Sequence, residues 1–296
     1  NNLLARDCYC LTETACKELL SELNLTVQEK VVPRNIILAK EIAEKSLFYN
    51  SREKDQIDQL VSLLDIDNFT KVQKRLVKNG MRKGFACLFY GSPGTGKTET
   101  VYQVARQTGR DIMYVNVSEI KSMWVGESEK NIQALFDRYR DLLQQTEQVP
   151  ILLFNEADAV IGIRQEGAQR AVDKMENSIQ NIILQEMEKL EGIMIATTNL
   201  TQNLDPAFER RFLFKIEFET PNLEAKRAIW HSMIPSLSET KSYDFSGGQI
   251  ENIARKGIID HIIRGRRSTL SMLHDYCKHE LIHTKNIQRQ PIGFRR

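Results

Sequence analysis

Apolar residues along the middle of this 296-residue chain follow two kinds of pattern. Short apolar or alternating runs predict strands over 85–90, 111–117, 150–154, 192–199 and 212–218. Apolar residues at helical spacing predict helices over 53–64, 97–108, 128–139 and 175–190. Strands that alternate with helices are typical of an α/β fold, a parallel sheet with helices on both faces.

The pattern changes after Pro221, where only helical spacing remains, over 223–234, 247–257, 258–264 and 267–283. This change predicts an α/β domain over 46–220 followed by a small α-helical domain over 221–296. Residues 1–45 are either the remnant of a preceding domain or an arm packed on the α/β domain. The chain begins with Asn-Asn rather than Met, which suggests a fragment.

Composition narrows the function classes. Charged residues make up 27% of the chain and the net charge is only +2, so no strong overall field favours nucleic acid or a membrane surface. No apolar run reaches the length of a membrane span. Five cysteines form an odd, sparse set, which is typical of a reducing cytoplasm, and the three near the N-terminus lack a fourth ligand for zinc.

The clearest candidate chemistry lies in 91–98, Gly-Ser-Pro-Gly-Thr-Gly-Lys-Thr, which fits the phosphate-loop pattern. Glycines let backbone N–H groups wrap a polyphosphate, Lys97 supplies a charge for its β/γ-phosphates, and the Thr98 hydroxyl is placed to bind Mg²⁺. The loop joins an apolar strand to a helix N-terminus, which favours anions. We expect a nucleoside triphosphate and Mg²⁺ to bind here. The residues expected to contact the nucleotide are Gly91, Ser92, Pro93, Gly94, Thr95, Gly96, Lys97, Thr98 and Glu99.

Polar residues follow the strand at 150–154, at the edge of the sheet where ligands gather in α/β folds. Glu156 is placed to polarise an attacking water, and Asn155 faces the Mg²⁺ shell. The strand at 192–199 also ends in polar side chains.

With these residues in place, 50–285 resembles an AAA+ ATPase, and within that superfamily the AAA proteins proper. Residues 91–98 match Walker A, and 151–158 resemble Walker B with Glu156 as the catalytic glutamate. Asn199 corresponds to sensor 1, which helps orient the lytic water. Gly248, at the start of the lid helix that carries sensor 2, is expected to approach the nucleotide. The family's Walker B ends in Asp-Glu where this chain has Asn155, which predicts weaker Mg²⁺ retention because charge-assisted hydrogen bonds are roughly twice as strong as neutral ones.

Two further motifs imply a ring. Residues 204–212 resemble the spastin and katanin branch, in which Arg210 and Arg211 would reach into the neighbouring subunit's site. Composition alone favours a core plug for Trp124, but Trp124, Val125 and Gly126 match the pore loop that grips substrate polypeptide in many of these hexamers.

The resemblance therefore implies a homo-oligomer, a hexamer as in many of the related proteins, that hydrolyses ATP and acts on a protein substrate. One alternative is a slow ATP-dependent switch or scaffold, which Asn155 favours. A DNA motor is a weaker alternative, because this sequence shows no basic stripe interleaved with aromatic residues. His279 and His283 complete an HExxH zinc pattern, but no third ligand follows, so we interpret it as a chance match on the last helix.

Overall fold

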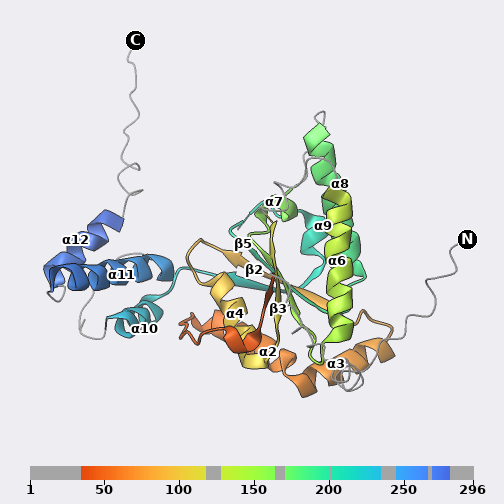
Figure 1. Cartoon of the computed structure of the whole chain (residues 1–296), viewed down its shortest axis with the longest axis horizontal. Coiled ribbons are helices and arrows are strands. Elements are labelled where there is room, and N and C mark those ends of the chain that lie inside the picture. Colours follow the sequence, from red (N-terminus) through yellow and green to blue (C-terminus); the bar gives the residue numbers. More distant parts are fainter. Residues whose placement is uncertain are drawn as a thin grey trace, which may run out of the picture. The chain divides into compact units, whose positions relative to one another are not determined.

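The computed structural model describes residues 35–117, 128–163, 171–200, 202–234, 245–265 and 269–280. A six-stranded sheet has the order β1-β3-β4-β5-β2-β6 (Figure 1). The strands are β1 (Ile36–Ile37), β2 (Phe85–Gly91), β3 (Ile112–Asn116), β4 (Ile151–Asn155), β5 (Ile193–Thr198) and β6 (Phe212–Phe218). The pairs among β2 to β6 are all parallel, as the alternation of strands and helices predicts.

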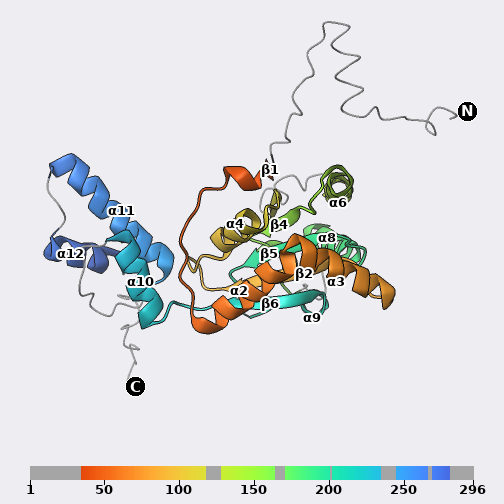
Figure 2. The same ribbon diagram turned by 90° about the horizontal axis from the view of Figure 1, so that it is seen from below.

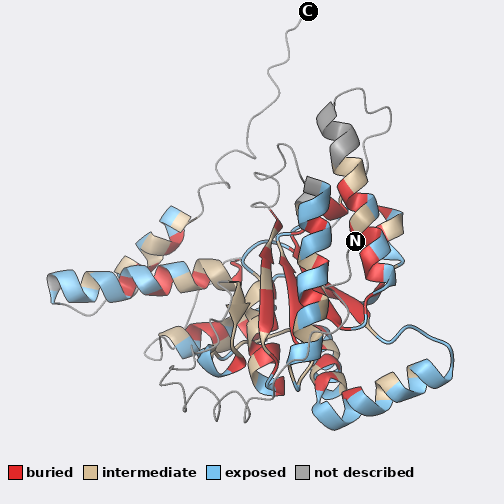
Figure 3. Ribbon diagram, turned by 45° about the vertical axis from the view of Figure 1, so that its right-hand side comes forward, coloured by how far each residue is buried: buried red, intermediate tan, exposed pale blue. Residues whose placement is uncertain are grey.

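Both faces of the sheet are covered, which explains why its central strands are apolar at nearly every position. In β2, Ala86 and Leu88 contribute to one buried cluster, and Cys87 and Phe89 to the cluster on the opposite face. Figure 3 shows the central strands as mostly buried. The predicted parallel sheet with helices on both faces is confirmed.

The first cluster joins the sheet to α6 (Ser128–Gln145), α7 (Asp158–Ile161) and α8 (Ala171–Glu188). The second joins it to α2 (Ser51–Leu64), α3 (Ile66–Lys78) and α4 (Lys97–Thr108). Figure 2 shows α2, α3 and α4 with the sheet from below. Helix α4 ends as predicted, because Gly109 adopts the left-handed conformation that caps many helices, with φ 66°.

Helix α3 was not among the predicted elements. Asp65 caps this helix by accepting from the backbone N–H groups of Asp67 and Asn68 at 3.2 and 3.4 Å. Phe69 is the only α3 residue that is fully buried, and apolar residues recur at helical spacing at 66, 69, 72 and 76, so the sequence did carry a signal for this helix. The short α7 and α9 (Pro206–Glu209) were also not predicted.

Three helices follow Pro221: α10 (Leu223–Met233), α11 (Gly247–Arg264) and α12 (Leu270–Glu280). They share a separate apolar cluster that includes Trp230, Phe245 and Ile253. The prediction of two helices over 247–264 is wrong, since α11 runs unbroken through Gly257. A glycine inside a helix costs only about 1 kcal/mol relative to alanine, which this packing can offset. Among the described residues, no helix is long and apolar enough to cross a membrane.

The junction between the sheet and α10 is fastened to the start of α2. Buried Glu53 closes a capping box with Asn50 and also accepts from the backbone N–H of Glu219 at 2.7 Å. Asn50 Oδ1 accepts from the backbone N–H of Asn222 at 2.8 Å. These bonds fix the chain where it leaves β6 and enters the helical part; a domain boundary at 220/221 stays a prediction.

Candidate active site

The segment 91–96 leads from the end of β2 to the start of α4, and its first and last residues must be glycine. Gly91 has φ 139°, and a Cβ there would lie 2.1 Å from the backbone oxygen of Phe218 on β6. Gly96 caps α4 with φ 95°, a conformation that side chains rarely adopt. The backbone therefore forms the concave, N–H-rich turn that the phosphate-loop pattern predicts, at the N-terminus of a helix.

Lys97 lies inside this loop rather than in solvent. Its Nζ donates to the backbone oxygens of Gly91 and Ser92 at 2.8 and 2.7 Å, and the residue is 7% exposed. Burial lowers the pKa of Lys97 from 10.5 to about 8, opposed by the negative charge of Asp158. The loop thus holds a cation whose present partners are two neutral carbonyls, a weaker match than phosphate oxygens.

Thr98, the next residue, contacts the end of β4. Its hydroxyl donates to Asn155 Oδ1 at 2.8 Å, so its oxygen keeps lone pairs for a cation. Asn155 Oδ1 also accepts from the Thr197 hydroxyl at 3.0 Å, and Asn155 Nδ2 donates to the Tyr114 hydroxyl at 3.2 Å. Oxygen donors suit Mg²⁺, which usually keeps several waters, so Thr98 and Asn155 fit the predicted direct and water-mediated roles.

Glu156 follows with its side chain exposed and its backbone strained. It has φ 53°, which is uncommon outside glycine and clusters at functional sites. Thr197 on β5 holds this turn, since its hydroxyl accepts from Glu156 N at 3.1 Å and its backbone oxygen accepts from Ala157 N at 2.8 Å. The geometry presents the Glu156 carboxylate at the carboxyl edge of the sheet, where it could accept a proton from water.

Sequence reasoning missed the part that Asp158 plays. Its Oδ1 accepts from the Thr198 hydroxyl and, at 2.9 Å, from the backbone N–H of Asn199. Asp158 therefore fixes the backbone that carries the exposed Asn199 side chain, beside Lys97 whose charge it favours. The signal was available in the sequence, since Asp158 follows the same strand as Asn155 and Glu156.

Helix α11 meets the phosphate loop directly. The backbone N–H of Gly248 donates to Gly94 O at 2.8 Å, and a Cβ on Gly94 would lie 2.8 Å from Ser246 Oγ. Ser246 caps α11 by accepting from Gln249 N at 3.4 Å. Gly248 thus lies against the loop that is expected to hold the nucleotide, so it is close to the position that the sequence predicts for it.

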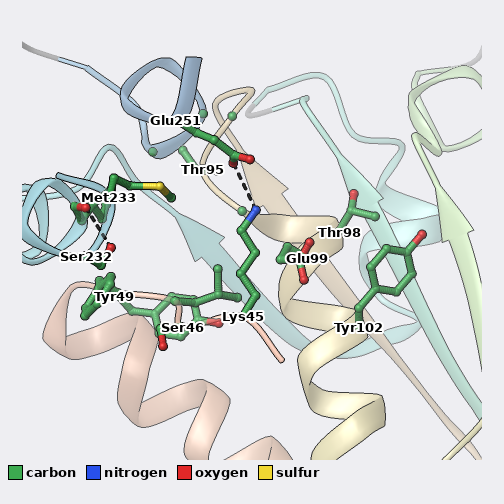
Figure 4. A pocket seen from close by; sticks show the side chains of 17 residues that line it. Lys45, Ser46, Tyr49, Thr95, Thr98, Glu99, Tyr102, Ser232, Met233 and Glu251 are labelled. Carbon is green, nitrogen blue, oxygen red and sulfur yellow. Dashed lines mark hydrogen bonds and ion pairs between the residues drawn. The ribbon is translucent and has the colours of Figure 1, made fainter. Parts of the chain in front are cut away.

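A pocket of about 330 Å³ opens beside this contact (Figure 4). Its walls combine the loop and α4 with the segment 45–49 and helices α10 and α11, including apolar Phe48, Tyr102, Ile229 and Met233. Lys45 and Glu251 form an ion pair at 3.1 Å on its rim. Segment 45–49 was not predicted as part of the site, because its apolar residues carry no motif. Apolar walls beside a phosphate loop suit the base and ribose of a nucleotide.

The two arginines predicted to act in a neighbour differ. Arg210 is exposed, and its Nε donates to Pro206 O at 3.3 Å. The Arg211 side chain is 21% exposed, pairs with the Glu188 carboxylate on α8 and donates to Ala207 O at 2.7 Å. Arg211 is therefore held within the chain, while the guanidinium of Arg210 remains available to a partner.

Trp124, Val125 and Gly126 lie outside the described residues, as do Cys8, Cys10, Cys16 and His283. The described part of the HExxH pattern includes Glu280, whose carboxylate accepts from Lys256 Nζ at 2.6 Å and Asn252 Nδ2 at 3.2 Å. These bonds give Glu280 a role in joining α11 to α12.

Comparisons with known proteins agree with this geometry. Residues 87–220 match the family "ATPase family associated with various cellular activities (AAA)". The chain is 30% identical over 194 residues to the 26S proteasome regulatory subunit 7 homolog of Saccharomyces cerevisiae, covering 62% of this chain and 39% of that protein. It is 32% identical over 197 residues to the Proteasome-associated ATPase of Thermobifida fusca, covering 60% of this chain and 33% of that protein.

A third relative is the ATP-dependent zinc metalloprotease FtsH of Staphylococcus haemolyticus, 32% identical over 208 residues, covering 64% of this chain and 28% of that protein. The chain thus spans less than half the length of each of these three relatives. The region over 87–220 is therefore similar to the AAA ATPase domain that this family describes.

Proposed function

We propose that this chain is one subunit of a ring-forming ATPase that uses ATP hydrolysis to remodel or unfold protein substrates. The observation that carries the proposal is the contrast between Arg210 and Arg211, one exposed and one held inside the chain. An exposed arginine before the start of β6, at the edge of the sheet opposite the phosphate loop, is suited to complete a second subunit's site. Relatives named as a 26S proteasome regulatory subunit and a proteasome-associated ATPase support a protein substrate.

Within one chain, we assign nucleotide binding to the phosphate loop and the adjoining pocket. Lys97 would exchange its two carbonyl partners for phosphate oxygens, a stronger charge-assisted pairing. Thr98 would hold Mg²⁺ directly and Asn155 through water. A bound Mg²⁺ would neutralise charge that develops on the phosphates. The residues expected to line the phosphates are Gly91, Ser92, Pro93, Gly94, Thr95, Gly96 and Glu99, with Gly248 from α11.

Hydrolysis would use side chains at the exposed edge. Glu156 would accept a proton from the attacking water, and Asn199 would orient that water from a backbone fixed by Asp158. Arg210 would act in the neighbouring subunit, and Arg211 would stay bound to Glu188 of its own chain rather than reach across. This separates two residues that sequence resemblance treats as a pair.

The trans role is tested by mixing two inactive variants. An Arg210→Ala chain keeps its phosphate loop, and a Lys97→Ala chain keeps its arginine, so a mixed interface should regain hydrolysis. Arginine fingers are worth about 10³ to 10⁵ in rate, so the recovered activity should stand well above either variant alone. The matched control replaces Arg210→Ala by Arg227→Ala, at a position on α10 outside the proposed interface.

Two outcomes would contradict the proposal. Mixed oligomers that form but stay inactive would remove Arg210 from the neighbour's site. Specific activity of the wild type that does not rise with protein concentration would argue against assembly. The proposal also includes four finer predictions: a hexamer, the substrate-gripping pore loop at 124–126, the spastin and katanin branch, and a cytoplasmic location.

Asn155 favours a second candidate function, a switch that binds ATP and turns it over slowly. The amide accepts hydrogen bonds from Thr98 and Thr197 without a charge of its own, which weakens its hold on a hydrated cation. Basal turnover measured with and without an unfolded protein separates the candidates. Stimulation by unfolded protein supports the motor, and slow turnover that does not respond supports the switch.

A further inference from the structure

Helix α3 carries a row of basic residues along one face. Lys71, Lys74, Arg75 and Lys78 are spaced three or four residues apart, which places their side chains next to one another on a helix. All four are exposed, as is Arg82 just after the helix, and α3 lies on the outside of the α/β part (Figure 2). We call these five residues the basic stripe.

The composition of the whole chain conceals this local charge. Residues 71–83 hold six basic residues and no acidic residue. The rest of the chain has 35 basic and 39 acidic residues, so the total of +2 hides a basic segment on a slightly acidic protein. A cluster of this kind on one helix face is the electrostatic footprint of a site for a polyanion.

The stripe has no anionic partner within the described part of the chain. There, only Lys83 of segment 71–83 forms an ion pair, at 3.7 Å with Glu191. Like charges three or four residues apart destabilise a helix, and the helix dipole offsets this only for Arg75 and Lys78 in the last turn. Helix stability therefore does not explain Lys71 and Lys74, whereas an anionic ligand does.

The helix that carries the stripe is held firmly by the rest of the protein. Phe69 is 3% exposed, and the guanidinium carbon of Arg110 lies 4.6 Å from the centre of its ring. Gln73 Nε2 donates to Glu191 O at 3.4 Å. The cations thus stand on a fixed scaffold, which lowers the ordering cost of binding.

The stripe lacks the side chains that single-stranded nucleic acids require. Proteins that bind single strands stack the bases on exposed aromatic rings. In α3 and the loop that follows it, over 66–84, the only aromatic residue is Phe69, and it is buried. Contacts to a duplex backbone need only cations and hydrogen-bond donors, so a duplex fits this surface better.

A membrane surface fits less well, because helices that bind membranes bury a broad apolar face in the lipid. In α3, Val72 and Leu76 are half-buried in the protein. Of the apolar residues that stay exposed, Ile66 lies three turns from Val77, and Met81 follows the helix. The same lack of a compact apolar anchor argues against an acidic protein partner.

We propose that the basic stripe binds the phosphate backbone of duplex DNA without reading its base sequence. Such contacts hold a protein on DNA but carry no sequence information. The stripe lies apart from the nucleotide site, since α3 leads toward Phe85 at the start of β2, whereas the phosphate loop begins at Gly91 at its end, about 20 Å along the strand. The inference therefore goes beyond the proposed function and does not depend on it.

The test measures how strongly salt weakens DNA binding. Fluorescence anisotropy of a labelled DNA duplex gives the affinity, and five phosphate contacts predict a loss of about 500-fold between 50 and 200 mM salt. In Lys74→Gln/Lys78→Gln, three contacts remain, so the loss should fall to about 40-fold. Lys74→Arg/Lys78→Arg should behave like the wild type, because phosphate contacts require the charge rather than the lysine.

Lys40→Gln/Lys54→Gln is the matched control, because it removes the same charge from two exposed lysines outside the stripe. It should keep the salt dependence of the wild type. Circular dichroism spectra of the control and of the Lys74→Gln/Lys78→Gln variant should be identical, which shows that both fold. Lys97→Ala should bind the duplex like the wild type, because it changes only the nucleotide site.

Several outcomes would overturn the inference. One is a wild type that does not bind the duplex at 50 mM salt, and another is an equal salt dependence in Lys74→Gln/Lys78→Gln and the control. A single strand bound as tightly as the duplex would rule out the choice of a duplex. Phosphatidylserine vesicles or polyglutamate bound more tightly than the duplex at equal anionic charge would assign the stripe to a membrane or to an acidic protein instead.

Discussion

The inner and outer halves of the candidate site are built differently. In the inner half, Lys97, Thr98, Asn155 and Asp158 each hydrogen-bond to another part of the chain. In the outer half, Glu156 and Asn199 are exposed, and among the described residues neither of these two side chains bonds to another side chain. The bonds that hold the outer half run through the backbone.

This difference separates binding from chemistry. A preformed inner half requires little rearrangement to accept phosphates, which favours affinity within a single chain. In the exposed outer half, a neighbouring subunit would have to supply further groups and shield the reacting side chains from water. The comparison predicts that changes in the two halves have separable effects on nucleotide affinity and turnover.

The largest effect is expected in the outer half. Glu156→Gln should reduce turnover by about 10²- to 10⁴-fold, because the amide cannot accept a proton from water. ATP affinity should stay near that of the wild type, since the inner half is untouched. Turnover and equilibrium ATP binding are measured side by side, with the exposed Glu224→Gln as a control for charge. A variant that loses affinity and turnover together would break the separation of the two halves.

The reciprocal change in the inner half should act on affinity. Lys97→Ala removes the cation that lies within the loop, and loss of charge-assisted hydrogen bonds to phosphate should weaken ATP binding at least about 100-fold. Lys83→Ala, which breaks an exposed ion pair of 3.7 Å with Glu191, is the matched control. Calorimetric titration with ATP measures both. Affinity like that of the wild type in Lys97→Ala would remove the loop from the nucleotide site.

A pH titration tests the inner half without changing its structure. Burial lowers the pKa of Lys97 to about 8, so in the free protein its cation is lost as pH rises through that value. ATP affinity should fall about tenfold between pH 7 and pH 9, and binding at pH 8.5 should take up about three-quarters of a proton as phosphate restores the charge. Calorimetry in buffers of different ionisation enthalpy measures this uptake. Lys97→Arg should abolish it, and uptake that persists there would assign the proton to another group.

The same ionisation acts on folding with a definite sign. The unfolded chain keeps this proton up to about pH 10.5, whereas the folded chain releases it near pH 8. Burial of the charged lysine therefore lowers the free energy of unfolding. This destabilisation is complete below pH 8 and is relieved as pH rises from 8 to 10.5.

The inner half was largely predictable from sequence, because its residues are adjacent in motifs. Backbone geometry dictates Gly91 and Gly96, and chemistry dictates Lys97 and Thr98, so a short pattern carries the loop. Tyr114 was not predictable, since it joins the site only through the pairing of β3 with β4. Contacts made by sheet register leave no local signal in a single sequence.

The same reasoning explains what sequence reveals of the fold. The buried strands were predicted within a few residues because an apolar run needs no partner to be recognised. Helix α3 was missed although its apolar residues recur at helical spacing, and segment 45–49 was missed because a pocket wall of ordinary residues carries no motif. Arg210 and Arg211 were indistinguishable in sequence, since only the position of Glu188 on α8 separates them.

The smallest effect concerns the place where α11 meets the inner half. A Cβ on Gly248 would lie 3.2 Å from Gly94 Cα and 3.4 Å from Gly94 O, so alanine must push the helix and the phosphate loop apart by a few tenths of an ångström. The matched change is Gly247→Ala, one residue earlier in the same helical turn, whose Cβ would lie at an ordinary 3.6 Å from Gly94 O. Both substitutions give α11 the same gain in helix propensity, so a difference between them reports the contact alone.

We expect Gly248→Ala to weaken ATP binding about two- to fivefold relative to Gly247→Ala, roughly the loss of one neutral hydrogen bond such as that from Gly248 N to Gly94 O. Turnover at saturating ATP should be equal in the two variants, because the outer half lies on the other side of the loop. Equal ATP affinities would show that the loop tolerates the extra methyl group and that α11 does not set the geometry of the inner half.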